Sequence, residues 1–176
     1  MIFLKQFLIS LVLISLILFV NKDNIVIPED AIRIRIIPNS NSKVDQDIKI
    51  KVKENVEEEL YSVLKDVRKV EEAREIIEDN MDNIDNLVYD TLNSNSYTLP
   101  YDIKFGYNYF PQKEYMGVKY DEGMYESLVI TLGEGKGDNW WCIMFPPFCL
   151  LEANQNYQSE IEYKSIIKEM INNYFK

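Results

Sequence analysis

The chain has 176 residues, a formal net charge of −10 at pH 7 and no histidine. This length suits one domain with its own core, and 47% hydrophobic with 27% charged residues is typical of a folded protein. The acidic balance disfavours nucleic acid as a partner, because phosphate backbones carry charge of the same sign. The lack of histidine excludes Ser-His and Cys-His nucleophile pairs and imidazole metal ligands, so we expect neither a metal nor another cofactor.

Residues 1–21 are predicted to be a signal peptide or a membrane anchor. Only two serines interrupt an apolar run of 14 residues from Phe7 to Val20, preceded by Lys5. The run would form ~21 Å of helix, which suits a signal peptide, whereas about 19 residues counted from Ile2 could just cross a bilayer.

The residues after the run leave cleavage open. The chain continues as Asn21-Lys22-Asp23-Asn24, without a small-x-small cleavage site. A buried core helix is a further alternative, although the run is apolar on every face. Because the positive end of such a segment stays in the cytoplasm, residues 22–176 are expected to be exported in both membrane cases.

The exported part is predicted to be one α+β domain over 31–176, joined to the leader by a linker over 22–30. Apolar residues alternate in strands and recur every three or four residues in helices. Ser42 is expected to cap the first helix, with Asp45 in its first turn. The expected sheet is largely antiparallel. The elements are a strand over 31–38, amphipathic helices over 42–66 and 70–92, strands over 97–110, near 118 and over 124–132, and a C-terminal helix over 161–174.

Two cysteines stand close together at Cys142 and Cys149. In an exported protein an even pair at this spacing predicts a disulfide, which would close a short loop bent by Pro146-Pro147. Half of a metal site and two buried thiols are the alternatives.

The segment from Gly133 to Trp141 combines three alternate glycines with two tryptophans. It matches neither a phosphate-binding loop nor a dinucleotide fingerprint, so the glycines are expected to permit a tight turn. The tryptophans either pack in the core or expose one ring to a partner. The hypothesis of a binding face includes Arg33 and Arg35 of the first strand together with Gly133, Glu134, Gly135, Gly137, Asn139, Trp140 and Trp141.

A catalytic interpretation would have to use carboxylates such as Glu126, Glu134 and Asp138, for instance in a cell-wall hydrolase. Nothing in their spacing places two of them opposite each other. We therefore predict a protein that is not an enzyme.

Two blocks of the sequence resemble the stage II sporulation protein R family of spore-forming Firmicutes. The first is AIRIRIIPNSNSKVDQDIKIKVKENV, over 31–56, and the second runs from Gly123-Met124-Tyr125 through LVITLGEGKGDNWWCIMFPPFC to Cys149. The stretch FPQKEY over 110–115 is also similar to the family. Pro38 and Asp138 depart from the family pattern, at positions where turns are expected.

The resemblance implies a function that composition does not show. Members are expected to be exported from the forespore into the space between the septal membranes. There they trigger a membrane-embedded aspartic protease that removes the pro-sequence of sigma-E. The resemblance thus implies a signal with a membrane protease as partner and no small-molecule substrate. A septal cell-wall hydrolase and a structural septal protein are the alternatives.

Overall fold

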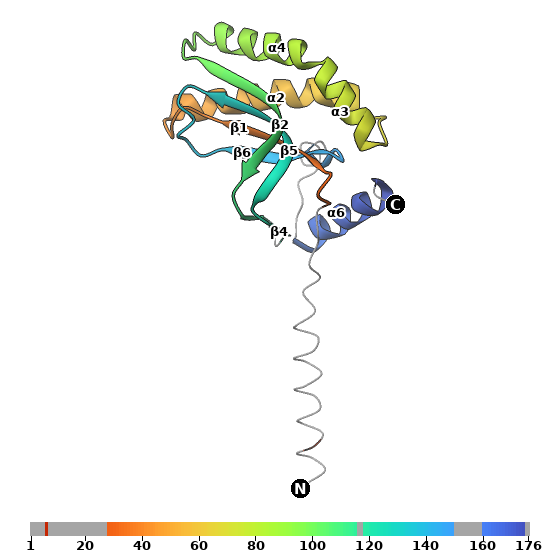
Figure 1. The fold of residues 1–176 in the computed structure, drawn as a ribbon. Coiled ribbons are helices and arrows are strands. Elements are labelled where there is room, and N and C mark those ends of the chain that lie inside the picture. Colours follow the sequence, from red (N-terminus) through yellow and green to blue (C-terminus); the bar gives the residue numbers. More distant parts are fainter. Residues whose placement is uncertain (1–5, 7–27, 116–117, 150–159, 175–176) are drawn as a thin grey trace.

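The computed structural model describes residues 6, 28–115, 118–149 and 160–174 (Figure 1). These residues form an α+β domain, as the sequence predicts. The elements, in chain order, are β1 (Ile32–Ile37), α2 (Lys43–Leu64), α3 (Val70–Asp79), α4 (Met81–Ser94), β2 (Tyr101–Phe110), β3 (Lys113–Tyr115), β4 (Val118–Tyr120), β5 (Gly123–Leu132), β6 (Trp140–Phe145) and α6 (Glu160–Tyr174).

The start of α2 follows from its capping chemistry. Ser42 has an extended backbone, and its hydroxyl accepts a hydrogen bond of 3.1 Å from the backbone N–H of Asp45. This bond satisfies one of the N–H groups that a helix leaves unpaired at its N-terminus. The predicted cap is confirmed.

The second predicted helix is divided at Asn80 into α3 and α4. The side-chain amide of Asn80 donates to the carbonyl oxygen of Ile76 at 2.7 Å, and its backbone N–H also bonds to the last turn of α3. Its own carbonyl accepts from Ile84 as α4 begins. An asparagine that satisfies these groups ends one helix while the next starts at once, so the apolar pattern continues through the break.

The main sheet has the strand order β2-β5-β1-β6. The β2–β5 and β1–β6 pairs are antiparallel, whereas β1 and β5 are parallel. Two parallel strands need a long connection that returns the chain to the same end of the sheet. Here α2, α3, α4 and β2, which lie between β1 and β5 in the chain, provide this connection. β3 and β4 form a separate hairpin.

Helices α2 to α4 lie on one face of this sheet (Figure 1). Ile32, Ile34 and Ile36 of β1 are almost fully buried in the core cluster, which also contains Leu60 and Leu64 of α2. Since side chains alternate along a strand, Arg33 and Arg35 point to the opposite face. The face away from α2 to α4 therefore carries the arginines.

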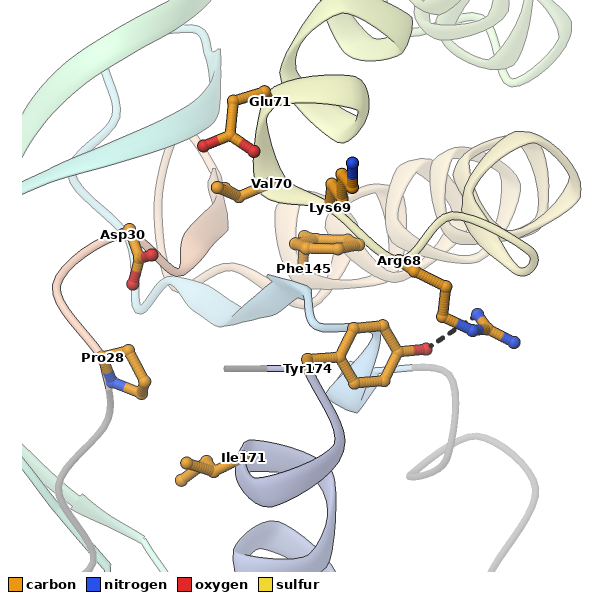
Figure 2. A pocket seen from close by; sticks show the side chains of 9 residues that line it. All are labelled: Pro28, Asp30, Arg68, Lys69, Val70, Glu71, Phe145, Ile171 and Tyr174. Atoms are coloured by element: carbon orange, nitrogen blue, oxygen red, sulfur yellow. Dashed lines mark hydrogen bonds between the residues drawn. The ribbon is translucent and has the colours of Figure 1, made fainter. Parts of the chain in front are cut away.

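The C-terminal helix α6 meets the connection between α2 and α3 (Figure 1). The ring of Tyr174 packs edge-on against Phe145 with 5.5 Å between centroids, and its hydroxyl accepts from Arg68 at 3.3 Å. Figure 2 shows these three side chains around a hollow of about 590 Å³. The other residues that line it are Pro28, Asp30, Lys69, Val70, Glu71 and Ile171.

The helices described by the structure include none that is long and apolar enough to span a bilayer. Apart from Gln6, the predicted leader over 1–21 lies outside the described residues, as do residues 22–27 of the predicted linker. Both assignments stay predictions.

Candidate functional site

The glycine turn between β5 and β6 docks onto the turn between β1 and α2. The backbone N–H of Gly137 donates to Pro38 O at 3.0 Å, and that of Lys136 donates to Asn39 O at 3.1 Å. The side-chain oxygen of Asn39 accepts from the N–H of Glu134 at 3.0 Å. We call this pair of turns, residues 38–41 and 133–138, the loop clasp. It joins the two blocks that carry the family resemblance.

The glycines are required by the geometry of the clasp. Gly133 and Gly135 have φ of +59° and +62°, which L side chains rarely adopt. A β-carbon on Gly137 would overlap the backbone of Ser40, at 2.6 Å from its carbonyl carbon. Positive φ therefore explains Gly133 and Gly135, and the close approach of two backbones explains Gly137, so that all three are structural parts of the predicted binding face.

Asp45 joins the clasp to the rest of the domain. It is 6% exposed and accepts hydrogen bonds from the hydroxyls of Ser40 and Tyr97, at 2.5 and 2.7 Å, and from the amide of Asn39 at 3.1 Å. These donors, with that of Ser40 the strongest, lower the pKa of Asp45 to about 2. Burial and the neighbouring carboxylate raise the pKa of Tyr97. From the sequence, Asp45 was expected only in the first turn of the helix.

The outer side of the clasp is polar. Glu134 and Lys136 are exposed and form an ion pair of 2.6 Å with each other. This pair lowers the pKa of Glu134 and raises that of Lys136. Glu134 is thus accessible to a partner, whereas the glycines beside it pack within the clasp.

Trp140 and Trp141 point to opposite faces of the sheet. The ring of Trp140 lies 5.2 Å from Nζ of Lys53 on α2. The ring of Trp141 packs edge-on against Tyr120 and Phe110, at 4.8 and 5.9 Å between centroids. Both tryptophans are half-buried against the core. The structure therefore brings Trp141, but not Trp140, to the face that carries the arginines.

Arg33 is enclosed by aromatic rings. Its side chain is among the largest that are fully buried, and its guanidinium carbon lies 3.3, 5.4 and 5.6 Å from the ring centroids of Tyr125, Phe110 and Trp141. Burial lowers the pKa of this arginine. In the described part of the chain, its Nε and Nη1 have no hydrogen-bond partner. Buried N–H groups without a hydrogen-bond partner cost stability, although the rings offset part of that cost.

Arg35 lies next to this cage and is half-buried. Its Nη1 donates to Tyr109 O at 3.3 Å, and its Nε and Nη2 each lie 2.7 Å from the side-chain oxygen of Asn139 when that amide is oriented to accept. Two residues from the predicted binding face are thus joined directly. Burial lowers the pKa of Arg35.

Two lysines near the start of β6 were not predicted to belong to the site. Nζ of Lys113, which is exposed, lies 5.3 Å from the ring of Trp141. Lys49 on α2 donates to Asp138 O at 2.9 Å, and its pKa is lowered by burial and, to a lesser degree, by Lys113. Both lysines lie in stretches that resemble the family, Lys113 in the stretch over 110–115 and Lys49 in the block over 31–56, but their contacts depend on the fold.

The two cysteines come together beside β6. Both are buried, and Ile143 O lies 3.7 Å from Sγ of Cys142 and 2.9 Å from Sγ of Cys149. Both thiols thus contact the same carbonyl oxygen. The disulfide between them stays a prediction.

The carboxylates weighed for catalysis lie in different surroundings. Glu126 is buried and accepts two hydrogen bonds from Arg74 of α3, at 2.5 and 2.8 Å. Glu134 and Asp138 are exposed in the clasp. Arg74 thus holds Glu126 in a bidentate ion pair, which is a structural arrangement.

These observations define a small α+β domain that presents a face of arginines and aromatic rings beside a closed loop clasp. Residues 28–155 match the family model of stage II sporulation protein R. A stage II sporulation protein R from Bacillus subtilis (strain 168) is 37% identical over 146 residues, which cover 82% of this chain and 65% of that relative. The chain thus spans a little under two thirds of that relative's length. No solved structure matches the chain.

The chain belongs to the stage II sporulation protein R family. It is therefore a sporulation protein, and the resemblance of its two sequence blocks is confirmed.

Proposed function

We propose that this protein is an exported signal that activates the membrane-embedded aspartic protease which processes pro-sigma-E. It would act in the septal space between forespore and mother cell, either released or tethered by its N-terminal segment. Membership of the stage II sporulation protein R family carries this proposal.

The composition and the site agree with a ligand. The chain has no histidine, and the described residues include no group of three side chains that could hold a metal. Glu126, one of the carboxylates weighed for catalysis, is held by Arg74. A ligand that binds the active arrangement of the protease a hundredfold better than the inactive one would shift that equilibrium by ~2.7 kcal/mol.

Co-expression in a non-sporulating host tests the proposal. The full chain would be produced with the protease and pro-sigma-E, and conversion to the shorter sigma-E would be followed by immunoblot. Conversion that needs the chain supports the proposal, and absence of conversion with all three proteins present contradicts it. Omission of the protease is the control.

The two alternatives make different predictions. A cell-wall hydrolase would release soluble fragments from purified peptidoglycan without any other protein. A purely structural septal protein would leave pro-sigma-E processing intact when it is removed from sporulating cells.

A further inference from the structure

Among the residues that the structure describes, three cations beside β6 form no ion pair with an acidic side chain, although acidic residues outnumber basic ones in the chain by 29 to 19. The ion pairs among the described residues use other lysines and Arg74, and none involves Arg33, Arg35 or Lys113. These three contact aromatic rings instead. We call them, together with Phe110, Tyr125 and Trp141, the cation–aromatic cluster.

The members of the cluster differ in what they offer to an anion. The buried guanidinium of Arg33, with Nε and Nη1 unpaired, is a fixed positive charge in a poorly solvated place. Electrostatic attraction is stronger there than in water, because little solvent screens the charge. Arg33 therefore adds to the positive potential at the cluster without being reached itself.

Arg35 and Lys113 are the cations of the cluster that a ligand can reach. Arg35 is half-buried, and its hydrogen bonds to Tyr109 and Asn139 use three of its five N–H groups. Two N–H groups remain for a carboxylate. Lys113 is exposed at the edge of Trp141, and its ammonium group can contact a second carboxylate.

We propose that the cation–aromatic cluster binds an acidic peptide segment of the protein partner, with Arg35 and Lys113 contacting its carboxylates and Trp141 its apolar atoms. This inference rests on the proposed function, because that function supplies a protein partner. Charge complementarity at such a contact mainly determines partner choice and association rate. The cluster shares Arg33, Arg35 and Trp141 with the predicted binding face. It excludes the other residues of that face and adds Lys113, Phe110 and Tyr125.

An acidic peptide fits this cluster better than a lipid surface does. A membrane of anionic lipids would present its charge to the whole domain, whose net charge is also negative. A peptide brings carboxylates to the cluster alone. The rings also favour a peptide, because aromatic side chains are typical anchors of protein interfaces.

The two tryptophans allow a direct binding test. In the full chain in neutral detergent micelles, Trp140→Phe leaves Trp141 as the sole indole reporter, and Trp141→Phe leaves Trp140. A short glutamate-rich peptide is added, with its glutamine counterpart as control. We expect the glutamate peptide alone to change the emission of Trp141 and to leave that of Trp140 unchanged.

Matched charge reversals locate the contact. Lys113→Glu in the Trp141 reporter should weaken binding of the glutamate peptide about tenfold, whereas Lys104→Glu, at an exposed lysine outside the cluster, should leave it unchanged. Arg35→Gln is the second variant and should weaken binding in the same way. Equal binding by all variants would overturn the inference. A Trp141 response to added phosphatidylglycerol, with none to the peptide, would assign the cluster to lipid and also overturn it.

Co-expression separates this inference from the proposed function. Processing that is normal with a folded Lys113→Glu variant would contradict the role of the cluster and leave the proposed function standing. Peptide binding at the cluster without any processing by the wild-type chain would contradict the proposed function alone.

Discussion

Gly137 packs against the backbone of Ser40 so closely that a β-carbon on the glycine would lie 2.6 Å from the Ser40 carbonyl carbon. The two residues belong to turns that are far apart in the sequence and are joined by backbone hydrogen bonds to Pro38 and Asn39 and by a bond from the N–H of Asp138 to the side chain of Asn41. The loop clasp thus fixes the start of β6, where Trp141 lies on the face that carries the arginines.

Replacement of Gly137 by alanine should destabilise the domain. The added methyl group meets backbone, which cannot move aside as a flexible side chain can, so we expect a loss of about 1–3 kcal/mol. Urea unfolding of the full chain in micelles would measure it. Glu134→Ala, on the exposed side of the same turn, should leave the unfolding midpoint unchanged, and equal midpoints for wild type and Gly137→Ala would contradict the clasp.

Asp45 should make the free energy of unfolding depend on pH in the acidic range. Its pKa is about 2 in the fold against an ordinary value of 3.8, so its contribution is fully present above pH 4 and is lost as the pH falls through 2. We expect this contribution to be about 1–2 kcal/mol after solvent screening. Asp45→Asn should lose the corresponding part of the pH dependence, as measured by urea unfolding between neutral and acidic pH. Parallel pH profiles for the two proteins would contradict this assignment.

Arg74 should stabilise the fold through Glu126. Arg74→Met leaves a carboxylate that is 7% exposed without its partner, and we expect a loss of about 2 kcal/mol, because the arginine itself is partly solvated. The double variant Arg74→Met, Glu126→Gln should recover part of this loss. A double-mutant cycle by urea unfolding measures the coupling, and strictly additive losses would show that the ion pair contributes nothing.

Cys142 and Cys149 should form a disulfide in exported protein. Mass spectrometry of protein recovered from outside the cytoplasm, alkylated without reduction, should find neither cysteine labelled. Reduction should then lower stability by roughly 2–3 kcal/mol, because the short loop gains freedom in the unfolded chain. Two alkylated thiols in such protein would contradict the prediction.

Local patterns predicted most of the fold. The alternation of Ile32, Ile34 and Ile36 with two arginines defined β1 and its two faces, and Ser42 defined the start of α2. The break at Asn80 was not predicted, because its cause is a side-chain hydrogen bond that leaves the apolar period intact. Alternation predicted β5 with nearly its observed bounds, whereas β6, which follows the glycine turn, was not predicted as a strand.

The candidate site was less accessible to sequence reasoning. The glycine turn was recognised, but its contact with Asn39 and Ser40 depends on pairing between distant strands. For the same reason the enclosure of Arg33 by Tyr125 and the approach of Lys113 to Trp141 had no local signal. The sequence indicated which types of residue lie on each face of the sheet. Which of these side chains contact each other is decided by the fold.

Reconstitution with defined sidedness tests the proposed signal most directly. The protease would be inserted in lipid vesicles with pro-sigma-E enclosed, and the full chain would be added to the outside in micelles. Release of the pro-sequence inside the vesicles, dependent on the added chain and on the protease, is the predicted result. Two results would contradict an activating signal that acts across the membrane. In the first, processing proceeds equally without the chain. In the second, processing fails at every concentration of folded chain, although the protease is active on its own substrate in detergent.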